Sequence, residues 1–155
     1  MKKYILLIVV IIASCAEQKQ EPETAGYSIR GEEESYMIGS DETTDFIRKW
    51  ADAHNERDME SILSMEKADI KIELPDGTVI NGQDEHSKVL ESFFANNVTW
   101  KPYWMLPYNS VVAKETWVIA GFALTSNVDG EENVVLHMGD IQLEDGLVLS
   151  LIHIS

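Results

Sequence analysis

Hydrophobic positions between residues 41 and 65 recur every three or four residues, which is the period of an amphipathic α-helix. Ser40 or Asp41 can cap the first turn, and Asp58 can cap a second short helix that ends near residue 65. The apolar stripe of the first helix consists of Phe46, Ile47, Trp50, Ala53 and His54. A helix with one aromatic stripe must bury that stripe, so the chain downstream is expected to form a surface for it.

Residues 69–74 alternate between apolar and polar, as in a β-strand, and residues 75–78 form a turn before a short arm at 79–80. A further helix is expected from Gly82 to about residue 96, with Asp84 as its N-cap. Its apolar face consists of His86, Val89, Leu90, Phe93 and Phe94.

From residue 98 onward the pattern has period two, and four segments read as strands: 98–106, 115–126, 133–143 and 147–154. Pro102 and Pro107 indicate a kink or a rim position in the first of them, and Gly121 a bend in the second. Strand spacing places Trp100 and Trp104 on one face. Because short turns join the last three segments, they are expected to form an antiparallel meander. The order of elements is α+β, and a bent sheet wrapped around the first helix would leave a cavity between helix and sheet.

The first 14 residues have a basic start and an apolar run too short to span a bilayer, which is typical of a signal peptide. The small residues before Cys15 resemble the lipobox of bacterial lipoproteins, in which the cysteine is lipidated. An ordinary signal peptide or an uncleaved anchor is the alternative. Residues 15–40 are polar and are interpreted as a flexible tether, which leaves residues 41–155 as the folded domain. An extracytoplasmic location on a lipid anchor follows, at the outer membrane in a Gram-negative host by the same resemblance.

The chain carries a formal charge of −15, with 12 basic and 27 acidic residues. No basic cluster is present to neutralise phosphates, so nucleic acid is excluded as a partner, and anionic lipid headgroups would repel the surface. Cys15 is the single cysteine, so lipidation would leave no thiol for a disulfide, a metal or a nucleophile.

Several short motifs together resemble the NTF2-like superfamily, which includes SnoaL-like cyclases and ketosteroid isomerases. They are Phe46-x-x-x-Trp50-x-x-Ala53-His54-Asn55-x-x-Asp58, Ala68-Asp69-Ile70, Pro75-Asp76-Gly77, Gly82, Phe93-Phe94-Ala95-Asn96 and Asp145-Gly146. The resemblance implies an α+β cone in which a strongly curved antiparallel sheet wraps around a long N-terminal helix, with two further helices. It does not imply one function, because this fold hosts enzymes, ligand carriers and dimerisation modules.

The resemblance to ketosteroid isomerases can be tested at three positions. Leu74 stands where the general-base aspartate is expected, and Trp50 where the oxyanion-hole tyrosine is expected. Gly139 stands at the position of the second oxyanion-hole acid, with Asp140 one residue out of register and therefore on the opposite face. Steroid isomerase chemistry is therefore not expected.

Two histidines are candidates for chemistry. His54 lies on the helix stripe beside Trp50, and His137 shares a strand face with Ile141. Each is either a pocket acid, base or hydrogen-bonding group, or a core histidine satisfied by a protein partner. The four histidines show no metal-binding spacing, so neither a metal site nor a cofactor is predicted.

Three functional hypotheses remain. The first is a ligand-binding domain without catalysis, which takes a small apolar molecule. The second is a SnoaL-like enzyme with His54 or His137 as base, and the third is a module that forms a homodimer through the outer face of its sheet. The residues expected to line the cavity are Phe46, Trp50, His54, Phe93, Phe94, Trp117, His137 and Ile141.

Overall fold

A computed structural model describes residues 23–28, 34–128 and 130–154 of the chain. The predicted signal peptide and Cys15 lie outside these residues. None of the helices in the described part is long and apolar enough to cross a membrane.

The first helix, α1 (Asp41–Glu56), buries the aromatic stripe as its sequence pattern predicts. Ser40 is its N-cap, although the Ser40 side chain makes no capping hydrogen bond. Arg57 then adopts a left-handed conformation that ends the helix, and α2 (Met59–Ser64) follows. The prediction that Asp58 caps α2 is confirmed, because its carboxylate accepts the Ser61 N–H at 3.0 Å.

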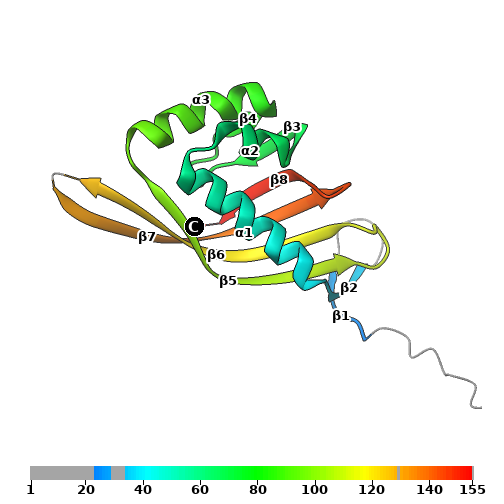
Figure 1. The fold of residues 1–155 in the computed structure, drawn as a ribbon. Coiled ribbons are helices and arrows are strands. Elements are labelled where there is room, and N and C mark those ends of the chain that lie inside the picture. The colour runs from blue at the N-terminus through cyan, green and yellow to red at the C-terminus, as the bar shows by residue number, and fades with distance from the viewer. Residues whose placement is uncertain (1–22, 29–33, 129, 155) are drawn as a thin grey trace, which may run out of the picture.

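The third helix, α3 (Gly82–Ala95), begins at the predicted residue, but its N-cap is Asn81 and not Asp84. The Glu85 carboxylate reaches back to accept the Asn81 N–H at 2.7 Å, which satisfies one of the donors at this end of the helix. All three helices lie on one side of the sheet (Figure 1), with α1 crossing β5 and α3 covering β3 and β4.

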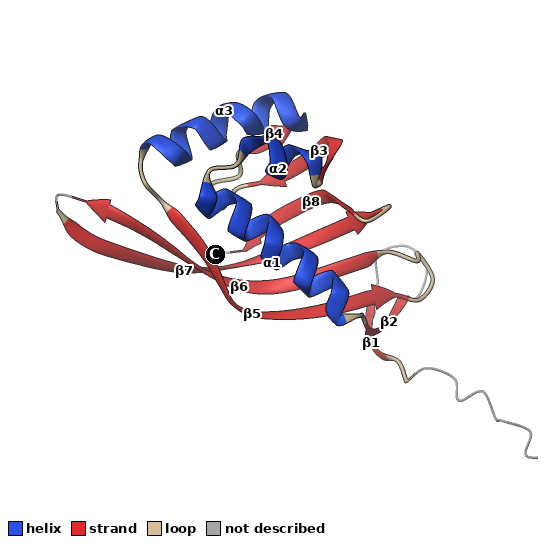
Figure 2. Cartoon of the chain, viewed as in Figure 1, coloured by secondary structure: helices blue, strands red, loops and turns tan. Residues whose placement is uncertain are grey.

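The described residues form one curved sheet of eight strands in the order β1-β2-β5-β6-β7-β8-β3-β4 (Figure 2). The strands are β1 (Ala25–Ser28), β2 (Glu34–Ile38), β3 (Glu66–Glu73), β4 (Val79–Asn81), β5 (Thr99–Ser110), β6 (Thr116–Val128), β7 (Glu131–Glu144) and β8 (Leu147–Ile154). Strands β6 to β8 form the predicted antiparallel meander, and β5 extends it as a fourth antiparallel strand. The sheet is nevertheless mixed, because β3 pairs with β8 in parallel.

The structure differs from the predicted tether over residues 15–40, because β1 and β2 lie within that segment and extend the sheet beside β5. Glu34 fixes β2 in place. Its carboxylate accepts four backbone N–H groups, from Ser35 and from the three consecutive residues Val111, Val112 and Ala113. These hydrogen bonds, led by that of Val112, lower the pKa of Glu34 and favour the charged form. The folded unit therefore begins before residue 41.

Strand β5 contains the predicted kink. Its register on β6 shifts between Pro102 and Trp104, so that Trp100 pairs with Leu124 and Trp104 with Gly121. A side chain at Gly121 would overlap the Trp104 ring, since an added Cβ would lie 2.1 Å from Nε1. The shift corrects the prediction that Trp100 and Trp104 share a face: Trp100 is buried, whereas Trp104 remains 38% exposed. An odd offset in pairing turns a side chain to the opposite face of a sheet.

The core lies between the helices and the concave face of the sheet. Its largest fully buried side chains are Trp50, Phe122, Ile47, Ile62, Ile70, Ile141, Val118 and Val148. Trp50 packs edge-on against Trp100, which itself stacks on Phe122 with ring centroids 4.1 Å apart. This aromatic column joins α1 to the centre of the sheet and forms one wall of the cavity described next.

Candidate functional site

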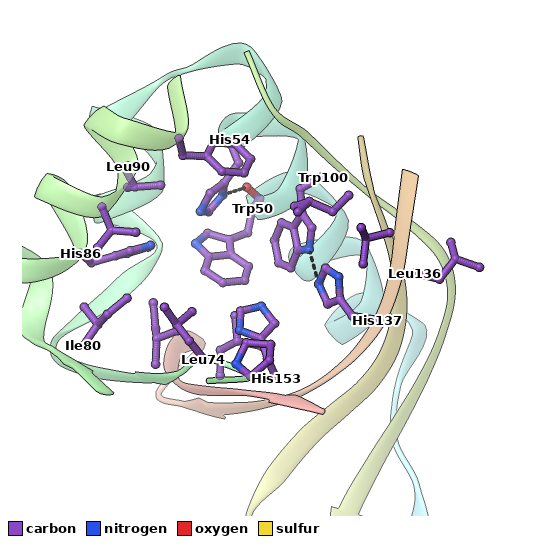
Figure 3. Close-up of a pocket in the computed structure, with 17 residues that line it drawn as sticks. Trp50, His54, Leu74, Ile80, His86, Leu90, Trp100, Leu136, His137 and His153 are labelled. Carbon is purple, nitrogen blue, oxygen red and sulfur yellow. Dashed lines mark hydrogen bonds between the residues drawn. The ribbon is translucent and has the colours of Figure 1, made fainter. Parts of the chain in front are cut away.

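A cavity of about 380 Å³ lies between the helices and the concave face of the sheet (Figure 3). This volume is within the range of small-molecule sites. Its lining contains four histidines and is otherwise apolar, with no Lys, Arg, Asp or Glu side chain. The lining residues are Trp50, His54, Ile72, Leu74, Pro75, Ile80, His86, Val89, Leu90, Phe93, Trp100, Leu124, Val135, Leu136, His137, Leu151 and His153.

Directly behind the wall, a buried carboxylate joins two of the lining residues. Glu66 lies at the start of β3, and its side chain has no exposed surface. Its Oε1 accepts the Trp50 indole N–H at 2.9 Å, and its Oε2 lies 3.0 Å from Nδ1 of His86. A buried carboxylate is costly unless donors surround it. These two contacts link α1, β3 and α3 into one polar network at the edge of the cavity.

His54 presents an unused lone pair next to this network. Its Nδ1 lies 2.7 Å from the carbonyl oxygen of Trp50, one helical turn earlier. A carbonyl only accepts hydrogen bonds, so Nδ1 carries the hydrogen and Nε2 is the acceptor. Burial, reinforced by the nearby His86, lowers the pKa of His54 to about 4 despite the Trp50 carbonyl. The ring is therefore neutral near pH 7, and no hydrogen bond joins its Nε2 to any described residue.

His137 and His153 lie on the sheet side of the cavity. The Trp100 indole donates to Nε2 of His137 at 3.0 Å, and because an indole is only a donor, the hydrogen of His137 must be on Nδ1. Burial lowers the pKa of His137. It also lowers the pKa of His153 to about 4, with His137 as a second cause. Nδ1 of His153 is buried without a hydrogen bond of normal geometry to the described residues.

This geometry separates the two predicted base candidates. The basic lone pair of His137 is engaged by Trp100, so His137 is poorly placed to accept a proton from a ligand. The lone pair of His54 is free, and the His86–Glu66 pair lies beside it, with the His54 and His86 ring centroids 5.9 Å apart. Acid–base chemistry needs at least two positioned polar groups. The His54 end of the cavity provides them.

A metal ion could be considered at the same end, because donor atoms of His54, Glu66 and His86 all lie within 4.8 Å of one another. The spacing rule used on the sequence could not detect this set, since the three residues come from different elements. In the observed arrangement both oxygens of Glu66 already accept N–H donors. Binding an ion through Glu66 would require these contacts to rearrange.

Four of the eight residues expected in the cavity do line it: Trp50, His54, Phe93 and His137. The other four do not. Phe46 and Phe94 pack at the margin of the core, and Ile141 is fully buried within it. Trp117 lies in a separate surface depression formed with residues of β3, β7 and β8. Helix and strand periodicity shows which side of an element faces the interior, but not whether a residue on that side lines the cavity or lies deeper in the core.

The sequence reasoning missed His86, Trp100 and His153 as lining residues, and Glu66 behind them. His86 lies on the apolar face predicted for the third helix, so a signal for it existed. Trp100 was hidden by the register shift in β5. Glu66 was missed because the predicted strand began at residue 69, three residues after the start of β3.

Asp140 occupies the outer face, as its register predicts, and takes no part in the cavity. The Tyr108 hydroxyl donates to its carboxylate, with both oxygens at 2.9 Å. Burial raises the pKa of Asp140, and this hydrogen bond opposes the shift. The positions compared with ketosteroid isomerases hold Leu74, Trp50 and Gly139, and the absence of steroid isomerase chemistry stays a prediction.

No family model and no curated protein sequence matches this chain. Solved structures do. SalBIII, an epoxide hydrolase/cyclase-like enzyme of pyran ring formation in the polyether salinomycin, is 17% identical, with TM-score 0.62 over 72% of this chain and 88% of its own. RV0760c from Mycobacterium tuberculosis, solved with estradiol-17beta-hemisuccinate, is 18% identical, with TM-score 0.61 over 73% of this chain and 92% of its own.

An NTF2-like protein of unknown function from Cytophaga hutchinsonii is 15% identical, with TM-score 0.55 over 72% of this chain and 88% of its own. At these identities the likeness establishes the fold, which is the α+β NTF2-like cone predicted from the sequence. It does not transfer a function.

Proposed function

We propose that the domain binds a small, predominantly apolar molecule in the cavity on the concave side of its sheet. The observation that carries this proposal is the lining: a cavity of about 380 Å³, open to solvent on one side, is lined by apolar and aromatic side chains, with histidines as the only titratable groups among the lining residues. Such a cavity favours an uncharged apolar guest, because a charged group would lose its hydration without a partner. RV0760c was solved with estradiol-17beta-hemisuccinate, so a protein of this fold can bind a molecule with a large apolar body, although that compound also carries a carboxylate.

Binding should be visible in the tryptophan fluorescence, because Trp50 and Trp100 both line the cavity. We expect an apolar probe such as 2-methylnaphthalene to alter the emission saturably in the chain carrying Cys15→Ser. A Leu124→Trp variant, which fills part of the cavity, should weaken binding at least about tenfold, the equivalent of about 1.4 kcal/mol. Trp117→Phe is the control, since it removes an indole outside the cavity and should leave the affinity unchanged.

Mass spectrometry of molecules that copurify with the chain would identify the natural guest. If neither a copurified molecule nor a saturable probe signal is found for folded protein, the binding proposal is wrong.

The second candidate is an enzyme of the SnoaL-like kind. It is favoured by one observation, the free Nε2 of His54 beside the His86–Glu66 pair. In this form of the proposal Nε2 of His54 accepts a proton from the carbon next to a carbonyl group, which leaves an enolate and a positively charged His54 ring. The Glu66 carboxylate behind His86 stabilises the positive charge on that ring. Incubation with the identified guest separates the two candidates, because an enzyme would return it with changed mass or isomeric form and a carrier would return it unchanged.

We further propose that the domain is held at a membrane through lipid on Cys15. The support is the lipobox-like sequence before Cys15. Acyl burial contributes about 0.8 kcal/mol per CH₂, so several acyl chains would retain the protein. We expect the wild-type chain in the detergent phase, with an acylated N-terminal peptide in its mass spectrum, and Cys15→Ser in the aqueous phase. Wild type in the aqueous phase would contradict the anchor.

The ligand-free dimerisation module is less well supported, because the interior is open and not filled by side chains. Homodimer formation through the outer face of the sheet stays a prediction. Trp117 and Ile152 of the outer-face depression would be the contacts to examine.

A further inference from the structure

At the His54 end of the cavity, the tautomer of His54 determines whether a guest meets a hydrogen-bond donor or an acceptor. Its Nδ1 must donate to the Trp50 carbonyl, so its Nε2 can only accept. The imidazole is also held rigidly, since Trp50, Trp100 and Phe93 surround it with ring centroids 4.7 Å, 5.4 Å and 6.4 Å away. Ring rotation that would exchange the two nitrogens would break the 2.7 Å hydrogen bond.

The Nε2 of His54 remains in contact with the cavity. His54 is one of the lining residues. Among the described residues, Nδ1 of His153 is the only side-chain nitrogen or oxygen atom that is fully buried and lacks a hydrogen bond. Nε2 of His54 has no hydrogen-bond partner in the described part of the chain either, so it must retain open surface. A bound guest therefore meets an acceptor here and not a donor.

The surroundings make the same end unfavourable for an anion. The neighbouring His86 is oriented by the Glu66 carboxylate, which adds negative charge behind the wall. No lysine or arginine lines the cavity to balance a second carboxylate. A carboxylic acid guest would lose hydration, and the imidazole of His86, which could pair with a carboxylate, already faces Glu66.

We infer that the cavity selects neutral guests that carry a hydroxyl group, an alcohol or a phenol, which donates its hydrogen to Nε2 of His54. This inference rests on the proposed function and specifies the chemical class of the guest. It gives the site the opposite polarity to an oxyanion hole, which presents donors to an oxygen. The apolar remainder of the guest would fill the volume between Leu90, Phe93 and Leu151.

Three probes of similar shape test the inference: 2-naphthol, 2-methylnaphthalene and 2-naphthoate, each titrated at pH 7 into the chain carrying Cys15→Ser. A buried hydrogen bond should make 2-naphthol bind about tenfold more tightly than 2-methylnaphthalene. We expect 2-naphthoate to bind at least about tenfold more weakly than 2-methylnaphthalene, because its charge is desolvated without a partner.

Two substitutions locate the effect. His54→Phe keeps an aromatic ring but removes the acceptor, so the preference for 2-naphthol over 2-methylnaphthalene should disappear. His54→Gln supplies an acceptor oxygen and should restore part of the preference. Trp117→Phe is the control outside the cavity and should retain the full preference. Thermal unfolding of each variant verifies that it is folded.

The outcomes are distinguishable. Equal binding of 2-naphthol and 2-methylnaphthalene, tightest binding of 2-naphthoate, or an unchanged preference in folded His54→Phe would overturn the inference and leave the cavity as a binding site. Tight binding of Zn²⁺ that abolishes the 2-naphthol preference would also overturn it, because the lone pair would then belong to a metal. If no probe binds to folded wild-type chain, the proposed function itself fails.

Discussion

Replacing Trp50 with alanine is expected to lower the free energy of unfolding by about 4 kcal/mol, the largest loss that a single truncation in this core should cause. Trp50 is 1% exposed, packs against Trp100 and His54, and donates to Glu66. Truncation would remove the central ring of the column and leave Oε1 of the buried carboxylate without its donor. Because whole domains are stable by only about 5–15 kcal/mol, this loss is a large share of the total.

Two further substitutions separate packing from hydrogen bonding. Trp50→Phe keeps most of the ring but lacks the N–H, so its loss should be smaller and should report mainly the uncompensated Glu66. Trp104→Ala is the surface control, because Trp104 is 38% exposed, and its loss should stay within about 1 kcal/mol. Urea unfolding measures all three. A loss for Trp50→Ala no larger than that for Trp104→Ala would refute the central position of Trp50.

The second large effect is a loss of stability in mild acid. The pKa values of His54 and His153 are each lowered to about 4, mainly by burial. In the unfolded chain both should titrate near their ordinary value of about 6.5. Between these pH values the unfolded chain binds more protons, so the stability that the neutral rings contribute is complete above about pH 6.5 and is lost as the pH falls towards 4. Each histidine accounts for roughly 3 kcal/mol of this change.

The groups that face these two histidines set the size of the effect. His86 and Glu66 lie beside His54, and His137 lies beside His153 with a lowered pKa of its own that acts in the same direction. The raised pKa of Asp140 acts in the opposite direction. Urea unfolding midpoints measured from pH 4 to pH 8 should therefore rise with pH, and His54→Phe should flatten the slope. A midpoint independent of pH across this window would show that the imidazoles are not buried in neutral form.

The sequence determined much of the secondary structure by itself. Several local signals each produced the element expected. They are the helical period of α1, the capping carboxylate of Asp58, the turn at residues 75–78 and the apolar–polar alternation in β6, β7 and β8. Hairpin partners adjacent in the chain follow from such signals because a short turn fixes their pairing. The order of elements predicted an α+β fold with a bent sheet, and the resemblance of the short motifs implied the NTF2-like cone. The residue types on the faces of α1 and β7 then placed Trp50, His54 and His137 in its cavity.

Only the tertiary structure decided the chemistry of that cavity. Trp50, Glu66 and His86 are separated by 16 and 20 residues along the chain and lie on three different elements, so no spacing rule connects them. The pairing of β2 with β5 and the parallel pairing of β3 with β8 join strands that are far apart in the chain. No short turn connects these strands, so the sequence gives no local signal for their pairing. The tautomer of a histidine depends on the atom that its ring nitrogen contacts. The Trp50 carbonyl fixes the tautomer of His54, and the Trp100 indole fixes the tautomer of His137. Periodicity records which side of an element is buried, whereas hydrogen-bonding partners depend on how separate elements pack in three dimensions.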